Sequence, residues 1–329
     1  MTPLAPLIES FFTDRLCRQL RASQNTVSAY RDTFRLLLGF AQKELGKAPS
    51  ALSLGDIDAP LVGRFLAHLE ADRRNGARSR NARLSAIHSF FRYVAFLEPA
   101  HSGLIQRVLA IPHKRCERNL VNFLTRPELE AVLKAPDQTT WIGRRDYALL
   151  LVAVQTGLRV SELIQLRPEQ LVLGTGAHIR CRGKGRKERC VPLTRQIAAA
   201  LKAWIAEQRL GPSDPVFQTR RRGSFSRDGI ERLVAKYAAK AAHDCPSLVG
   251  KRVSPHVLRH TAAMQLLQSD VDCAVIALWL GHESVETTGI YLHADLSIKE
   301  RALARTAPPN IGHRRYRPGD RLLAFLNGL

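Results

Sequence analysis

Apolar side chains recur every three to four residues through most of the first 111 residues, which is the spacing of a buried helix face. The clearest stripe runs from Ser23 to Leu45, where a serine can cap the start and Gly46 stands at the expected end. Similar stripes follow over residues 60–73 and 79–97. We therefore expect residues 1–111 to form a helical domain.

A polar and basic segment, residues 112–122, interrupts this pattern and begins with a proline, so we expect a linker there. Beyond it, Thr125 and Glu128 have the spacing of a capping box, which predicts that a second domain starts with a helix. Helical stripes continue through this domain, which we place at residues 123–300, before a tail over residues 301–329.

One stretch of the second domain has a different pattern. Residues 178–193 (HIRCRGKGRKERCVPL) carry glycines on both sides of Lys184, which predicts a β-hairpin that turns at these residues. The Gly-Lys pair does not complete a phosphate-binding P-loop, because His178 and Gly185 stand where that motif needs glycine and Ser or Thr. The expected fold is therefore mainly α, with a small β-hairpin or sheet in an α+β second domain.

The charge balance indicates the class of partner. The chain has 50 Lys and Arg against 29 Asp and Glu, a formal net charge of +21, which favours binding to polyanions and to nucleic acid first. Anionic membrane is the alternative, but no apolar run approaches the roughly 20 residues of a membrane span. The start of the chain has no basic leader before an apolar core, so we expect a cytoplasmic, nucleoid-associated protein.

The six cysteines lie far apart and form no closely spaced pair, so we expect no metal site and no cofactor. Three basic clusters are candidates for contacts with DNA phosphates. Solvated surface charge is the alternative for the first cluster, at the start of a predicted helix, and for the third, in a polar loop. The candidates are Arg78, Arg80 and Arg83; Arg180, Arg182, Arg186 and Lys187 of the hairpin; and Arg220, Arg221 and Arg222.

Candidate chemistry concentrates between Ser254 and Tyr291. Pro255 predicts a helix start, which places His256 and Arg259 on one face, with His260 also within reach. Gly281 is expected to end a second helix, with His282 emerging from the turn and Tyr291 about two turns along a third short helix. Far upstream, Arg159 follows an uncharged run and has Glu162 in place to orient it, so we expect it to bind an anion. These residue types together favour phosphoryl transfer without a metal.

Five motifs, TGLRVSEL, RGKGRKER, SPHVLRHTAA, LWLGHES and YLHAD, resemble in order and spacing those of the tyrosine recombinases of the phage-integrase family. That family includes Xer-type resolvases and transposon-borne integrases. The first domain is similar, through weaker motifs, to the family's helical, SAM-like core-binding domain. The resemblance implies a two-domain clamp around duplex DNA and a catalytic set of Arg159, Lys184, His256, Arg259, His282 and Tyr291.

The resemblance also implies a role for each of these residues. Tyr291 would attack the scissile phosphate to give a 3′-phosphotyrosyl link and a free 5′-hydroxyl. Both arginines and His282 would bind the phosphate, Lys184 would protonate the leaving oxygen, and His256 would serve as general acid or base. The covalent link conserves the bond energy, so neither ATP nor a metal is expected.

Several properties stay open at this point. The reaction could be integration, excision, resolution or transposition of a mobile element, at a specific site, by a homo-tetramer or together with sister recombinases. The tail could dock on a neighbouring subunit or fold back on its own domain. Two other functions are possible: a type IB topoisomerase that relaxes DNA, or a non-catalytic DNA-binding accessory protein.

Overall fold

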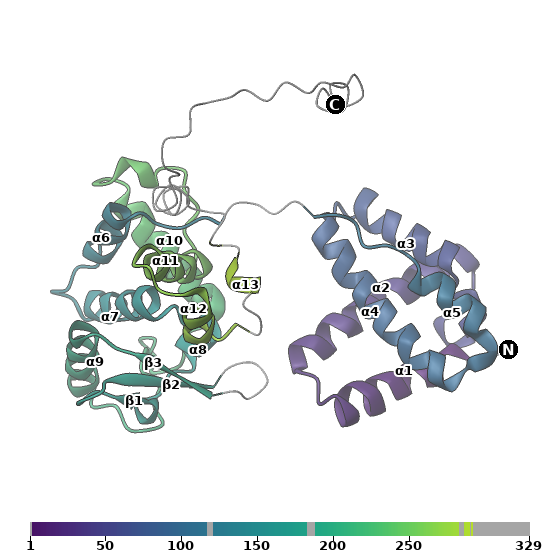
Figure 1. Ribbon diagram of the computed structural model, residues 1–329, viewed down its shortest axis with the longest axis horizontal. Helices are drawn as coiled ribbons and strands as arrows, with labels where there is room; N and C mark the ends of the chain where they lie inside the picture. The colour runs from purple at the N-terminus through teal and green to yellow at the C-terminus, as the bar shows by residue number, and fades with distance from the viewer. Residues whose placement is uncertain (1, 117–120, 183–187, 283–285, 290, 292–329) are drawn as a thin grey trace, which may run out of the picture. The chain divides into compact units, whose positions relative to one another are not determined.

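The computed structural model describes residues 2–116, 121–182, 188–282, 286–289 and 291, and the chain divides into two compact units, residues 1–118 and 119–329 (Figure 1). Each unit has a hydrophobic core of its own. The chain is mostly helical, with one small sheet in the second unit, which confirms the predicted fold class.

The first unit is a set of helices packed around an aromatic core. The rings of Phe11, Phe34 and Phe90 lie within 5.2 to 6.1 Å of one another, measured between centroids. Ser23 accepts a hydrogen bond from the backbone of Thr26, and so caps the longest helix as expected. The helices are α1 (Leu4–Ser10), continued by a π-helical segment (Phe11–Gln19), α2 (Gln24–Leu45), α3 (Ala59–Ala71), α4 (Ala77–Leu97) and α5 (Ser102–Leu109).

The second unit begins with the predicted capping box. A side-chain oxygen of Glu128 accepts a hydrogen bond from the backbone of Thr125 at 2.8 Å. Its helices are α6 (Arg126–Lys134), α7 (Trp141–Thr156), α8 (Val160–Ile164), α9 (Arg195–Gln208), α10 (Arg227–Ala241), α11 (Pro255–Gln268), α12 (Cys273–Leu280) and α13 (Glu286–Gly289).

Helix α7 is the centre of this unit, because it contacts α6, α9 and α11 and is buried along most of its length. The sheet consists of β1 (Leu171–Val172), β2 (His178–Arg182) and β3 (Glu188–Pro192), all antiparallel, and β3 also contacts α12. Strands β2 and β3 pair Ile179 with Val191, both fully buried. The predicted hairpin strands are confirmed, and their turn at residues 183–187 lies outside the described residues.

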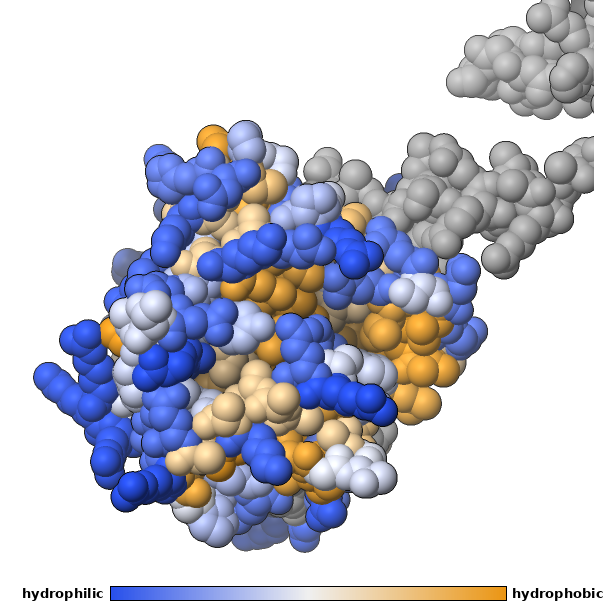
Figure 2. All heavy atoms as spheres, turned by 90° about the vertical axis from the view of Figure 1, so that its left-hand side faces the viewer, coloured by the Kyte–Doolittle hydropathy of each residue, from blue (hydrophilic) through white to orange (hydrophobic). Residues whose placement is uncertain are grey.

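Within the described part of the chain, no helix combines the length and apolar character that crossing a membrane requires. Figure 2 shows one face of the molecule, where hydrophilic side chains cover much of the surface and apolar side chains lie between them. The large apolar side chains that stay exposed include Phe96 at the end of α4 and Leu278 on α12.

Candidate active site

Two glycines end α7 and α12 and bring the ends of these helices together. Gly157 and Gly281 both have a left-handed backbone, with φ of 63° and 66°. A Cβ atom at Gly157 would lie 2.6 Å from a methyl carbon of Leu280, and one at Gly281 would lie 2.9 Å from a guanidinium nitrogen of Arg189. Glycine is therefore required at both positions by conformation and by space.

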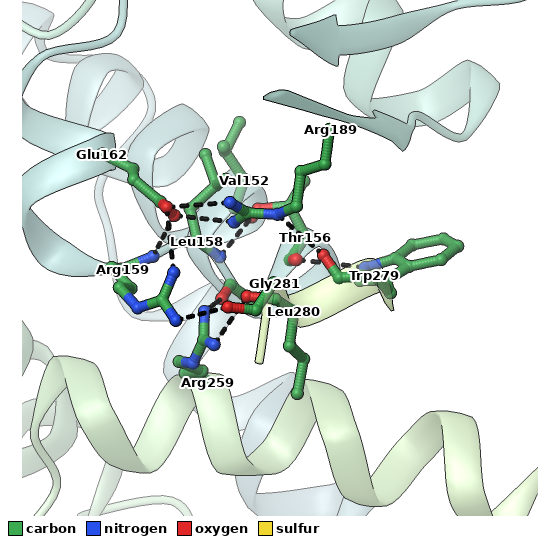
Figure 3. A network of polar contacts seen from close by, with 11 residues as sticks. Val152, Thr156, Leu158, Arg159, Glu162, Arg189, Arg259, Trp279, Leu280 and Gly281 are labelled. Atoms are coloured by element: carbon green, nitrogen blue, oxygen red, sulfur yellow. Dashed lines mark hydrogen bonds and ion pairs between the residues drawn. The ribbon is translucent and has the colours of Figure 1, made fainter. Parts of the chain in front are cut away.

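The guanidinium groups of Arg159 and Arg259 converge on this junction (Figure 3). Arg259, on α11, donates to the carbonyl of Gly157 at 2.6 Å and to that of Leu280 at 2.7 Å. Arg159, which precedes α8, donates to the carbonyl of Gly281 at 2.6 Å. Carbonyls at a helix C-terminus carry partial negative charge, so they hold both cations without neutralising them.

Arg259 is buried, with only 5% of its surface exposed. Burial, and next the nearby charge of Arg159, lower its pKa to about 10, so the group is still protonated at neutral pH. The hydrogen bonds to the carbonyls of Gly157 and Leu280 use two of the five N–H donors of the guanidinium. A buried, charged guanidinium that donates to these neutral carbonyls is suited to bind an anion.

Glu162 and Arg189 form a buried ion pair beside the two arginines. Both terminal nitrogens of Arg189, on β3, donate to Glu162 at 2.7 and 2.9 Å, and its Nε donates to the carbonyl of Trp279. Glu162 also accepts from the backbone and the guanidinium of Arg159. Burial by itself raises the pKa of Glu162, but these hydrogen bonds and charges lower it overall. The pair thus connects the strand after the hairpin turn to Arg159 and to the end of α12.

We expect Arg189→Leu to destabilise the protein by about 3 kcal/mol, because it leaves the carboxylate of Glu162 buried without its main partner. The double variant Arg189→Leu/Glu162→Leu should be more stable than this single variant, since it does not leave the carboxylate of Glu162 buried without Arg189. Urea unfolding measures both differences.

The control for this experiment is Arg126→Leu, which removes an exposed ion pair with Glu130 and should change stability by less than about 0.5 kcal/mol. An Arg189→Leu variant as stable as this control would contradict the structural role of the buried pair.

Tyr291 lies in a small apolar cluster, only 1% exposed, against Met264, Ile276 and Leu280. Its hydroxyl is 2.9 Å from Nδ1 of His260. Burial raises the pKa of the phenol, and the charge of Arg259 partly offsets that effect. The sequence placed Tyr291 on the third short helix; α13 covers Glu286–Gly289, and Tyr291, two residues later, has the backbone of a 3-10 helix.

The other two candidate histidines lie near the tyrosine and the arginines. The ring of His282 is nearly parallel to that of Tyr291 at 6.4 Å, and its Nδ1 is 2.8 Å from the hydroxyl of the buried Thr288. Burial, then Arg259 and Arg159, lower the pKa of His282 to about 4. His256 lines a cleft of about 300 Å³ together with both arginines, and burial followed by Arg259 lowers its pKa.

The low histidine pKa values predict a loss of stability in mild acid. His260 and His282 have pKa values of about 4 in the folded protein against 6.5 in the unfolded chain, and His88 and His256 shift in the same direction. Between these values the unfolded state binds more protons, so stability falls as the pH falls. We expect the Tm to decrease between pH 7 and pH 5, and an unchanged Tm would contradict this.

Five of the six predicted catalytic residues, all but Lys184, lie in this region of the second unit. Lys184 lies outside the described residues. Catalytic roles for all six stay predictions. The sequence did not assign His260 or Arg189 to the site, although the i to i+4 spacing of His256 and His260 on α11 was a signal for the first.

The predicted DNA-contact residues differ in exposure. Arg80 is buried at 7% exposure and donates to the carbonyl of Pro112, so the structure gives it an internal role that the sequence did not predict. Arg83 donates to the carbonyl of Ala29 and the hydroxyl of Thr33. Arg78, Arg180 and the arginines at 220–222 are exposed. The side chains of Arg182, Arg186 and Lys187 lie outside the described residues, and DNA contact stays a prediction for every member of the set.

Comparison with known proteins agrees with these features. Residues 122–297 match the Phage integrase family, and residues 8–95 match the Phage integrase N-terminal SAM-like domain. The integrase/recombinase relative y4rC of Sinorhizobium fredii is 57% identical over 326 residues, 99% of this chain and 98% of that protein. Tyrosine recombinase XerD of Pseudomonas putida is 33% identical over 293 residues, 88% of this chain and 92% of its own length.

Solved structures show the same fold. The XerH site-specific recombinase bound to palindromic difH substrate has a TM-score of 0.67 at 23% identity, covering 86% of this chain and 80% of its own. The Tn1549 transposon integrase in complex with a circular intermediate DNA has a TM-score of 0.69 at 14% identity, covering 93% and 100%. By sequence and by fold, this chain belongs to the phage integrase family, the tyrosine recombinases.

Proposed function

We propose that this chain is a site-specific recombinase that cuts and rejoins duplex DNA through a 3′-phosphotyrosyl intermediate. One observation carries the proposal: two guanidinium groups converge beside the end of α12, and the charge of one of them, Arg259, acts on a buried tyrosine. Cations positioned before the reaction are what a developing phosphorane requires, because they need no reorganisation as charge accumulates.

Arg159 and Arg259 bind the non-bridging oxygens of the scissile phosphate in this mechanism. The phosphate enters the cleft that both arginines and His256 line, to which Arg227 and Glu231 of α10 also contribute. His282 gives a further hydrogen bond. Because its Nδ1 faces the hydroxyl of Thr288, the opposite ring nitrogen is left to donate to the phosphate.

Tyr291 is the nucleophile and forms the bond from its Oη to phosphorus as the bond from phosphorus to the 5′-oxygen breaks. Lys184 protonates the departing oxygen and His256 assists as general acid or base. The phosphotyrosyl bond conserves the energy of the phosphodiester, so the reverse attack by a 5′-hydroxyl rejoins the strand without ATP, metal or cofactor.

The domain assignment belongs to the same proposal. Residues 1–111 form the core-binding domain, residues 112–122 the linker and residues 123–300 the catalytic domain of a clamp on double-stranded DNA. The partners are a specific recombination site and further recombinase subunits, as a homo-tetramer or with sister recombinases. The tail at 301–329 docks on a neighbouring subunit or folds back on its own domain, and the protein associates with the nucleoid.

A plasmid with two copies of the target site tests this function against the topoisomerase alternative. The site is first isolated by covalent capture from a library of nicked duplexes with randomised half-sites. Recombined circles of new size are the expected product. Plasmid that is only relaxed would favour a type IB topoisomerase, and no covalent product with any duplex would favour a non-catalytic DNA-binding protein.

A further inference from the structure

His260 lies within the SPHVLRHTAA motif but has no role in the mechanism so far, yet within the described part of the chain it makes the one hydrogen bond of the Tyr291 hydroxyl. Its Nδ1 lies 2.9 Å from that oxygen, and the two rings lie edge to face with centroids 5.5 Å apart. We infer that His260 accepts the phenolic proton of Tyr291 during cleavage. This inference rests on the proposed function and adds a residue to it.

Helix α11 explains how the contact arises. His256, Arg259 and His260 occupy one turn and a fraction of this helix, so the residue that binds the phosphate and the residue that binds the nucleophile have a common rigid support. Arg259 is fixed by the carbonyls of Gly157 and Leu280. The position of His260 relative to the phosphate site is fixed with it.

The direction of the hydrogen bond follows from the burial of the phenol. Tyr291 is 1% exposed, and a buried hydroxyl needs an acceptor for its proton. Nδ1 of His260 fulfils that need when the proton of the imidazole is on Nε2. The phenol then uses its hydrogen in this bond and keeps its oxygen lone pairs for phosphorus.

Burial and the charges around His260 keep it in the accepting form. His256 faces it edge to face at 4.1 Å on the same helix, and Arg259, His282 and Tyr291 are its other charged or titratable neighbours. Burial, then His256, Arg259 and His282, lower its pKa to about 4, so the imidazole is neutral at pH 7. The negative charge of a bound phosphate would raise that pKa and improve the acceptor during the reaction.

The step balances as follows. The bond from Oη of Tyr291 to phosphorus forms, the bond from phosphorus to the 5′-oxygen breaks, and the phenolic proton moves to Nδ1 of His260. The 5′-oxygen takes its proton from the leaving-group side of the site, where the proposed mechanism places Lys184. On rejoining, His260 returns its proton to the tyrosine.

Two pairs of measurements test this role on the nicked duplex isolated by covalent capture. His260→Leu removes the acceptor of the phenolic proton. We expect adduct formation to slow about 100-fold, which is the rate contribution of one general base, and the affinity for DNA to stay unchanged. The same slowing is expected when a sulfur replaces the 5′-bridging oxygen, because a thiolate leaves without protonation. Restoration of the rate by sulfur would place His260 on the leaving-group side and overturn the inference.

His260→Asn and His260→Gln give a matched comparison that does not depend on the leucine variant folding. Both amides can fill the space of the imidazole and form hydrogen bonds, but neither can take up a proton at neutral pH, so we expect both variants to form adduct about 100-fold more slowly than wild type. A rate equal to that of wild type in either variant would overturn the inference. So would a His260→Leu variant that cleaves as fast as wild type or faster. Wild-type protein that forms no adduct would instead overturn the proposed function itself.

Discussion

Replacing Tyr291 by phenylalanine is expected to abolish the covalent protein–DNA adduct while leaving DNA binding intact. The change removes one oxygen, and the ring can keep its place in the apolar cluster with Met264, Ile276 and Leu280. The loss should therefore be chemical rather than structural. The measurement is the yield of adduct on a nicked duplex that traps the intermediate, resolved on a denaturing gel.

Tyr147→Phe is the control for this variant, because it removes a partly exposed hydroxyl elsewhere in the second unit. We expect it to form adduct at the wild-type rate. A Tyr291→Phe protein that still forms adduct would show that another residue is the nucleophile, and the proposed mechanism would be wrong.

Replacing Arg259 by lysine is expected to slow adduct formation by about 10²- to 10³-fold, the effect of removing one preorganised charge-stabilising donor. Lysine keeps the charge, but its ammonium is a point charge and cannot hold the carbonyls of Gly157 and Leu280 as the guanidinium fork does. The cation would then sit in a different place relative to the phosphate. Single-turnover rates at saturating DNA measure the effect.

Arg252→Lys provides the comparison, since Arg252 is an exposed arginine shortly before α11. Its rate should stay within about twofold of wild type, as expected for a surface position. If Arg259→Lys were equally active, the guanidinium geometry would not matter and the clamp on the phosphate would have to be assigned elsewhere. Thermal unfolding of both variants separates a folding defect from a chemical one.

The sequence was sufficient for most of the secondary structure. The stripe from Ser23 to Leu45 and the capping box at Thr125 predicted their helices because local spacing and cap chemistry decide both. The hairpin strands followed from the glycines around the turn. Gly281 was expected at a helix end, and it has the left-handed conformation that such an end requires.

The contacts that join distant segments could not be predicted in the same way. In the sequence, Arg189 is one of several arginines of the hairpin. Only the packing of β3 against α12 brings its guanidinium to Glu162, 27 residues earlier. Arg80 was a candidate for contact with DNA phosphates, but the path of the chain at Pro112 buries it. Both outcomes depend on how distant segments pack together in the tertiary structure. The periodicity of the sequence gives no information about that packing.

The partner of the nucleophile is a third example. His260 and Tyr291 are 31 residues apart, and no helical spacing connects them. Helical spacing alone identified His260 as a neighbour of His256, whereas the bond to the phenol depends on how the chain returns after α12. Motif resemblance covered six positions and gave no role to this one.

The most direct test of the account is the chemical identity of the protein–DNA link. Adduct trapped on the nicked duplex is digested with protease and nuclease, and the modified peptide is sequenced by mass spectrometry. The account predicts a nucleotide joined through its 3′-phosphate to the phenolic oxygen of Tyr291, with a free 5′-hydroxyl on the released strand. A link at any other residue, or through a 5′-phosphate, would contradict it.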